Sequence, residues 1–185
     1  MTLALTHSVA LQGLEGHLVT IEVDIADGLP GYALLGLPDA ALSESRDRVR
    51  SAIVNCGEVW PNRKVTVSLS PAWLPKSGSS FDLAICISVL SAHESIEKEK
   101  IEELLFLGEL SLDGRIRSVR GVLPALMAAY KAGVRTAVVP AANFEEAQLM
   151  QAMNIIPMDH LKQVLRWLRT GEREVVQEFD LQWEQ

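Results

Sequence analysis

A predicted strand, a loop of small residues and an apolar segment follow one another over residues 64–93, and this succession constrains the fold more than any other stretch. Residues 64–70 (KVTVSLS) alternate between polar and apolar side chains, as a strand with one buried face does. The loop contains Lys76-Ser77-Gly78-Ser79-Ser80, and residues 83–93 are apolar at nearly every position, which favours a buried helix. Strand–loop–helix turns of this kind often carry a nucleophile or bind an anion. The remaining residues decide whether this loop does either.

The patterns of the other segments predict a chain of mixed strands and helices. Strands are expected where polar and apolar residues alternate, and helices where apolar residues recur every three or four positions. The Asp113-Gly114 pair predicts a hairpin between residues 104–112 and 115–119. Further strands are expected at residues 1–5, 17–25, 32–35, 136–139 and 155–156. Further helices are expected from a cap at Asp39 to Gly57, at residues 121–132, from Asn143 or Phe144 to Gln151, and from a cap at Asp159 to Gly171.

The composition predicts one cytoplasmic domain. The 185 residues suffice for one ordinary core and a short tail, and no apolar run reaches the roughly 20 residues that a bilayer span needs. Cys56 and Cys86 stand alone in apolar segments and are expected as free thiols in a reducing compartment. The formal net charge of -7 argues against strong nucleic-acid binding by this segment alone. No membrane contact is expected.

Several blocks, taken in order along residues 1–170, resemble the N-terminal domain of the Mg-chelatase-like AAA+ ATPases of the ComM/YifB family. Their order and spacing make the resemblance more specific than any single motif. One departure is Trp73, which stands where the family usually has an aspartate, so no role of that aspartate is carried over. The blocks are residues 28–31 with 36–38, residues 44–53 with Asn55, residues 69–72 and 74–76 with 81–83, residues 107–110 with 113–114, and residues 119–122.

The resemblance implies a fold and an assembly. The fold is the α/β (α+β) ribosomal protein S5 domain 2-like fold, a mixed sheet with packed helices that is also found in the proteolytic domain of Lon. Residues 171–185 then form an acidic linker towards an AAA+ module, and the ATP and Mg²⁺ site of that module lies beyond Gln185. Family members form hexameric rings and are associated with DNA branch migration in transformation and recombination.

The resemblance to Lon also suggests a peptidase, with Ser80 at the position of the nucleophile. A serine hydroxyl is inert at neutral pH unless a base removes its proton, and in Lon-like proteases the base is a lysine. Leu123 occupies the position of that lysine, and the next lysine, Lys131, is more than two helical turns further along. We therefore expect no catalytic residue in this segment, and a residual serine peptidase remains the alternative.

A phosphate-binding interpretation of residues 76–80 (Lys76, Ser77, Gly78, Ser79 and Ser80) is weaker than it first looks. A nucleotide-binding P-loop needs a Gly-Lys-Ser/Thr sequence at a fixed distance from an earlier glycine, and this chain has none. At most, the loop offers amides to an anion at the start of a helix. The simpler interpretation is a loop that caps the helix. Metal binding is not expected either, because His7, His17, His93 and His160 are dispersed without partners at ligand spacing.

Two groups of arginines are candidates for contacts with DNA phosphates or with an acidic surface of a neighbouring subunit. The alternative is that both groups are solvated faces balanced by nearby carboxylates. The first group is Arg46, Arg48 and Arg50, and the second is Arg115, Arg117 and Arg120. The sequence thus predicts a non-catalytic accessory domain that aids ring assembly or guides DNA or a partner, with a residual peptidase or an independent nucleic-acid-binding module as alternatives.

Overall fold

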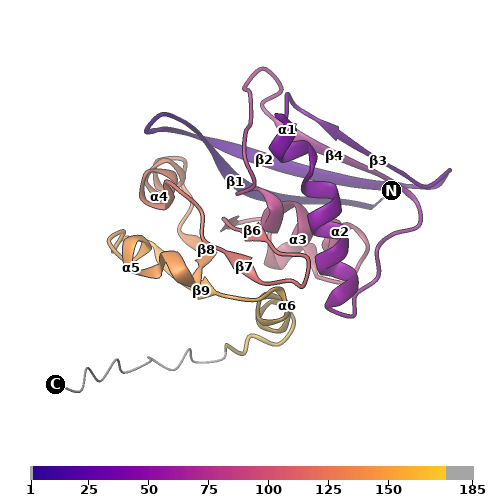
Figure 1. Ribbon diagram of the computed structural model, residues 1–185. Helices are drawn as coiled ribbons and strands as arrows, with labels where there is room; N and C mark the ends of the chain where they lie inside the picture. The colour runs from indigo at the N-terminus through magenta and orange to yellow at the C-terminus, as the bar shows by residue number, and fades with distance from the viewer. Residues whose placement is uncertain (1, 174–185) are drawn as a thin grey trace.

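Residues 2–173 are described by a computed structural model, and they form a seven-stranded mixed sheet with helices on both faces (Figure 1). The strands are β1 (Thr2–Gln12), β2 (Glu15–Ala26), β3 (Gly31–Leu35), β4 (Lys64–Ser70), β5 (Leu104–Phe106), β6 (Glu109–Leu110), β7 (Ile116–Arg117), β8 (Thr136–Pro140) and β9 (Asn154–Met158). The order in the sheet is β3-β4-β2-β1-β5-β8-β9, and β6 pairs separately with β7. The predicted mixed sheet with packed helices is confirmed.

The sheet has an antiparallel part and a parallel part that meet at β1. Strand β1 pairs antiparallel with β2 from Thr2 opposite Ile25 to Gln12 opposite Glu15, and β4 continues the antiparallel part on the other side of β2. Strands β5, β8 and β9 run parallel to one another. A single residue pair, His7 opposite Leu105, joins β1 to β5. Strand β3 is parallel to β4 and forms one edge of the sheet.

Helices cover the two faces of the sheet unequally. The longer helices are α2 (Ser45–Asn55), α3 (Asp82–Ala92), α4 (Val122–Lys131) and α6 (Leu161–Thr170), and the short ones are α1 (Ala40–Ser43), α5 (Phe144–Ala147), and the 3-10 turns η1 (Lys98–Lys100) and η2 (Ala141–Asn143). Helices α2, α3 and α6 share the larger apolar core on one face, whereas α4 and α5 pack on the other face with β5, β8 and part of β1. No helix within residues 2–173 is long and apolar enough to cross a bilayer.

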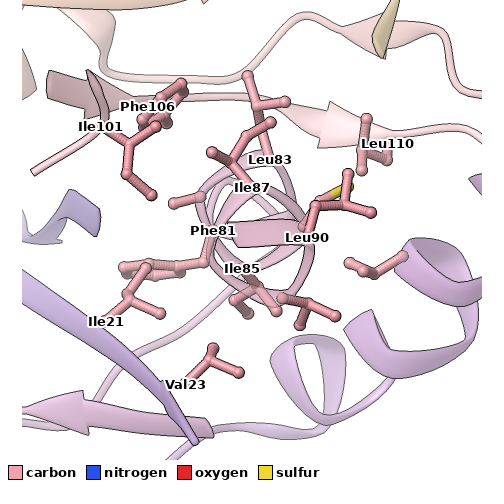
Figure 2. Packing of buried hydrophobic residues seen from close by; sticks show 14 of the residues in the cluster. Ile21, Val23, Phe81, Leu83, Ile85, Ile87, Leu90, Ile101, Phe106 and Leu110 are labelled. Atoms are coloured by element: carbon pink, nitrogen blue, oxygen red, sulfur yellow. The ribbon is translucent and has the colours of Figure 1, made fainter. Parts of the chain in front are cut away.

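Helix α3 lies at the centre of the larger core. All eleven of its residues are buried, which explains why its sequence shows no polar face. Figure 2 shows side chains leaving the helix in several directions, with Ile21 and Val23 of β2 on one side and Phe106 on another. A helix that is apolar all round must be covered all round, and here the sheet, α2 and the β6–β7 hairpin do so.

Three predicted elements differ in detail from the structure. The helix expected from Asp39 to Gly57 is divided at Glu44, where the guanidinium of Arg48 donates to the carbonyl of Ala41 at 3.0 Å. The helix expected up to Gln151 ends at Ala147 and continues as turns. Helix α6 is capped by His160 rather than Asp159, because the imidazole Nδ1 accepts from the amide of Lys162 at 3.1 Å.

The hairpin and the cysteines agree with expectation. Strands β6 and β7 pair on either side of Asp113-Gly114, although β5, from the same apolar run as β6, joins the main sheet instead. Cys86 is buried, Cys56 is partly exposed, and both are free thiols. The predicted linker over residues 171–185 lies mostly outside the described residues.

Candidate functional site

An open cleft of about 380 Å³ lies beside the loop at residues 77–80. Its walls come from β1, the loop at residues 77–80, β6, and residues 118–125 around the start of α4. Val9 and Leu11 supply an apolar side, and Glu109 and Arg120 are the charged residues of the lining. The fold thus brings the predicted nucleophile position and the predicted lysine region to the same place, although about 40 residues of sequence separate them.

Ser80 lines this cleft together with the carboxylate of Glu109. Within the described residues, the lining contains no lysine, histidine or cysteine, and the structure records no hydrogen bond for the Ser80 hydroxyl. The neighbouring Ser79 donates its hydroxyl to Oε2 of Glu109 at 2.6 Å. The carbonyl of Ser80 accepts from the amide of Gly108 at 3.1 Å, which fixes the loop to the strand region beside it. Glu109 is engaged by Ser79, and within the described residues no hydrogen bond joins the Ser80 hydroxyl to a group that could take its proton.

Leu123 lies in the first turn of α4, next to Val122, which lines the cleft. Its side chain is half-buried, and its amide donates to Oε1 of Glu146 at 2.9 Å. Lys131 is the last residue of α4 and is exposed, so its amine is not part of the cleft lining. Leu123, which the resemblance to Lon places at the position of the lysine, is not part of the cleft lining, and this correspondence stays a prediction.

Lys76 does not contribute to an anion-binding loop, and that prediction is wrong. Its side chain is fully buried, and Nζ donates to the carbonyls of Gly36 at 2.8 Å and Leu69 at 2.9 Å, and to that of Pro71. Burial lowers the pKa of Lys76. The ammonium group holds three separate segments together and is not available to a ligand in the cleft.

The loop amide at Gly78 already binds an anion from the same chain. The carboxylate of Asp39 accepts from this amide at 3.2 and 3.3 Å, and the same carboxylate caps α1 by accepting from Leu42 at 2.8 Å. With Lys76 turned away and Gly78 occupied, the loop does not fit a nucleotide phosphate. Helix α3 has no side-chain cap from this loop either, since its N-cap is Phe81.

A buried ion pair between Arg48 and Asp82 was not predicted from the sequence. Arg48 Nε lies 2.7 Å from Oδ2 of Asp82, and Nη2 lies 3.0 Å from Oδ1. Oδ2 also accepts from the amide of Leu110 at 3.1 Å. Burial raises the pKa of Asp82 to about 6, and Arg48 opposes that rise. The one available signal was a single carboxylate at the head of an otherwise apolar helix, since such a charge needs a partner.

The remaining arginines occupy different surroundings. The guanidinium of Arg48 is bound within the domain, so it is not the outward contact that the sequence suggested. Arg115 pairs with Asp113 at 2.9 Å, and Arg117 donates to the hydroxyl of Ser111 at 2.5 Å. Arg120 lines the cleft, whereas Arg46 and Arg50 are exposed on α2 and have no ion pair within residues 2–173. As contacts for DNA or another subunit, these arginines stay a prediction.

Within residues 2–173, no group of three His, Cys, Asp or Glu side chains lies close enough together to hold a metal ion.

Comparison with known proteins identifies the family. The family described as subunit ChlI of Mg-chelatase matches residues 21–143. The chain belongs to the Mg-chelatase ChlI family. Within this ChlI family, its resemblance to the N-terminal domain of ComM and YifB is confirmed by two relatives. It is 39% identical over 173 residues to the competence protein ComM of Haemophilus influenzae, an alignment that covers 94% of this chain and 34% of ComM. It is 40% identical over 168 residues to the uncharacterized protein YifB of Escherichia coli, covering 91% of this chain and 33% of YifB.

Two further similarities complete the comparison. An uncharacterized protein of Mycobacterium tuberculosis is 53% identical over 169 residues, covering 91% of this chain and 34% of that protein. Lon protease 1 of Myxococcus xanthus is 26% identical over 165 residues, covering 83% of this chain and 20% of the protease. The similarity to Lon agrees with the predicted Lon-like fold. This ChlI-family chain spans about a third of the length of ComM and YifB.

Proposed function

We propose that this chain is a non-catalytic accessory domain of a Mg-chelatase-like AAA+ ATPase. The observation that carries the proposal is the cleft at Ser80, whose lining has no lysine, histidine or cysteine in the part of the chain that the structure describes. A serine without a positioned base loses most of its catalytic rate. The similarity to Lon protease then concerns the scaffold, and the chemistry of the longer protein belongs to the ATPase portion.

The role of the domain is to aid assembly of the ATPase ring or to guide DNA or a protein partner to it. The relative named a competence protein, ComM, supports a process that handles DNA during transformation, and branch migration is the activity that the family resemblance suggests. The loop at residues 76–80 does not fit nucleotide phosphates, so ATP and Mg²⁺ are assigned to the ATPase portion.

A fusion experiment tests this function. The chain is joined to the ATPase portion of ComM, and the fusion is compared with the ATPase portion alone by sedimentation and by DNA-stimulated ATP hydrolysis. We expect the fusion to assemble at lower protein concentration or to respond more strongly to DNA, and Ser80→Ala to change neither property. Equal assembly and equal stimulation with and without the domain would remove the proposed role.

A further inference from the structure

Part of one face of the sheet has no helix packed against it in the described part of the chain. On β1, β2, β3 and β4, every second side chain points into the core with α2 and α3. The intervening side chains point to the opposite face, where α4 packs only near the β1–β2 turn, at Val9, Leu11 and Leu18 (Figure 1). The uncovered remainder is called the open face here, and its central residues are Leu3, Leu5, Glu22, Asp24 and Leu35.

The open face places two carboxylates between leucines. The strand register sets Glu22 opposite Leu5, and Asp24 opposite Leu3, on neighbouring strands. Leu35 lies on the far side of Glu22, beyond Ser68. Leu3 and Leu35 are 41% and 52% exposed, which is high for leucines in the strands of a sheet.

One of the two carboxylates has a shielded oxygen without a donor in the described part of the chain. Asp24 Oδ1 is shielded from solvent, and the described residues provide no hydrogen-bond partner for it. Neither Glu22 nor Asp24 forms an ion pair within residues 2–173, although Lys64 lies on the same face. An acceptor shielded in this way is costly unless a donor reaches it. The open face therefore fits a partner that presents cations together with apolar side chains.

One exposed side of α2, called the α2 stripe here, presents both cations and an apolar side chain. Arg46, Arg50 and Val54 follow one another four residues apart, so they lie on one side of the helix, and all three are exposed. Four residues of helix advance by about 6 Å. Two residues of strand, the separation of Glu22 and Asp24, advance by about 7 Å. The two guanidinium groups and the two carboxylates therefore match in spacing as well as in charge.

We propose that the open face of one copy of this chain binds the α2 stripe of a second copy. Helix α2 packs on the opposite side of the sheet from the open face, so a copy cannot satisfy both surfaces by itself. The contact is head-to-tail, which closes into a ring when the rotation between copies permits. This inference rests on the proposed role in ring assembly and names the surfaces that carry it.

Sedimentation of the chain at increasing concentration, in low and high salt, tests the contact. We expect self-association that weakens in high salt, because the paired groups are charged. The double variants Glu22→Lys/Asp24→Lys and Arg46→Glu/Arg50→Glu are each expected to self-associate at least about tenfold more weakly. Mixing the two variants restores association, because each retains one wild-type surface. Glu145→Lys and Lys131→Glu, which change charge on α5 and α4, serve as matched controls and are expected to behave as wild type.

Several outcomes overturn the proposal. The proposal is wrong if the wild-type chain stays monomeric at every concentration. It is also wrong if both double variants self-associate as strongly as the wild type. Far-UV circular dichroism checks that the variants fold, and the single changes Asp24→Asn and Arg50→Gln give the same test with less disturbance. If branched DNA binds at low salt and only the Arg46→Glu/Arg50→Glu variant loses it, while no self-association occurs, α2 is a nucleic-acid surface instead. The two failures are distinguishable, because a fusion that responds more strongly to DNA supports the proposed function even when the isolated chain does not self-associate.

Discussion

Arg48 and Asp82 form a two-point ion pair between α2 and α3, with Nε to Oδ2 at 2.7 Å and Nη2 to Oδ1 at 3.0 Å. The carboxylate is fully buried at the head of α3 and also accepts from the amide of Leu110 in β6. Three elements that are distant in sequence therefore meet at one side chain. The pair fixes the end of the loop that forms one wall of the cleft.

Removal of Arg48 should destabilise the chain strongly. Arg48→Ala leaves the Asp82 carboxylate buried with a single amide donor, and breaking a buried ion pair from one side typically costs about 3–5 kcal/mol. Arg50→Ala is the matched control, since Arg50 is exposed on the same helix, and a change of no more than about 0.5 kcal/mol is expected at protein concentrations too low for self-association. Urea denaturation measures both free energies of unfolding. Similar costs for the two variants would contradict a structural role for the pair.

The cost of losing Arg48 should depend on pH. Burial raises the pKa of Asp82 from 3.8 to about 6 in the folded chain. A raised pKa means that the folded state binds the proton of Asp82 more tightly than the unfolded state does. The stability that this protonation adds is therefore complete below about pH 4 and is lost as the pH rises through about 6. Without Arg48 the pKa rises further, because the cation that opposed the burial effect is gone.

Arg48→Ala is therefore expected to cost more at pH 8 than at pH 5. Urea denaturation of wild type, Arg48→Ala and Asp82→Asn at both pH values checks this. Asp82→Asn carries no titratable group there and serves as the reference. An Arg48→Ala cost that is the same at pH 5 and pH 8 would rule out a buried, ionised Asp82.

Lys76 should be essential for stability although it faces no ligand. Lys76→Met keeps most of the volume of the side chain but leaves the carbonyls of Gly36, Leu69 and Pro71 without their shared donor. Buried acceptors without donors cost about 1–3 kcal/mol each, so a loss of at least about 3 kcal/mol is expected. Lys131→Met, on the exposed end of α4, is the control. Thermal and chemical denaturation of both variants decide between this structural role and a surface role for Lys76.

Two glycines with positive φ should respond differently to alanine. Gly36 has φ +112°, and a Cβ there would lie 2.2 Å from the carbonyl oxygen of Leu69. Gly78 has φ +87°, and a Cβ there would meet nothing within 4 Å. Gly78→Ala is expected to cost about 1–2 kcal/mol for the backbone conformation alone. Gly36→Ala should cost clearly more, because the steric clash adds to the same strain, and equal costs would contradict the tight approach of Gly36 to β4.

The regular elements were predictable because their signals are local. Alternation in residues 64–70 identified β4, the apolar run at 83–93 identified α3, and Asp113-Gly114 identified the β6–β7 hairpin. The division of the long predicted helix at Glu44 did not follow from the local pattern, and beside it the guanidinium of Arg48 donates to the carbonyl of Ala41. A pattern of residues in one segment carries no information about such a contact.

The candidate site was predictable only in part, for a related reason. Lysine is a residue that sequence reasoning places at the surface, and the burial of Lys76 depends on carbonyls from three separate segments that converge on its Nζ. The partner of Asp82 lies 34 residues away in the sequence, so only the unusual position of a carboxylate at the head of an apolar helix hinted at it. The assignment of Ser80 to a nucleophile position and of Leu123 to a lysine position came from the resemblance to Lon, and both stay predictions.

Reaction of the chain with a fluorophosphonate probe, alongside turnover of an unstructured peptide, tests the central claim most directly. The wild-type chain and Ser80→Ala are compared at neutral and alkaline pH, with an active Lon-type peptidase as the positive control. No labelling and no turnover above background are predicted for either chain, because the cleft lining within residues 2–173 contains no lysine, histidine or cysteine to take the proton from the Ser80 hydroxyl. Labelling or peptide cleavage by the wild type that disappears in Ser80→Ala would contradict the account.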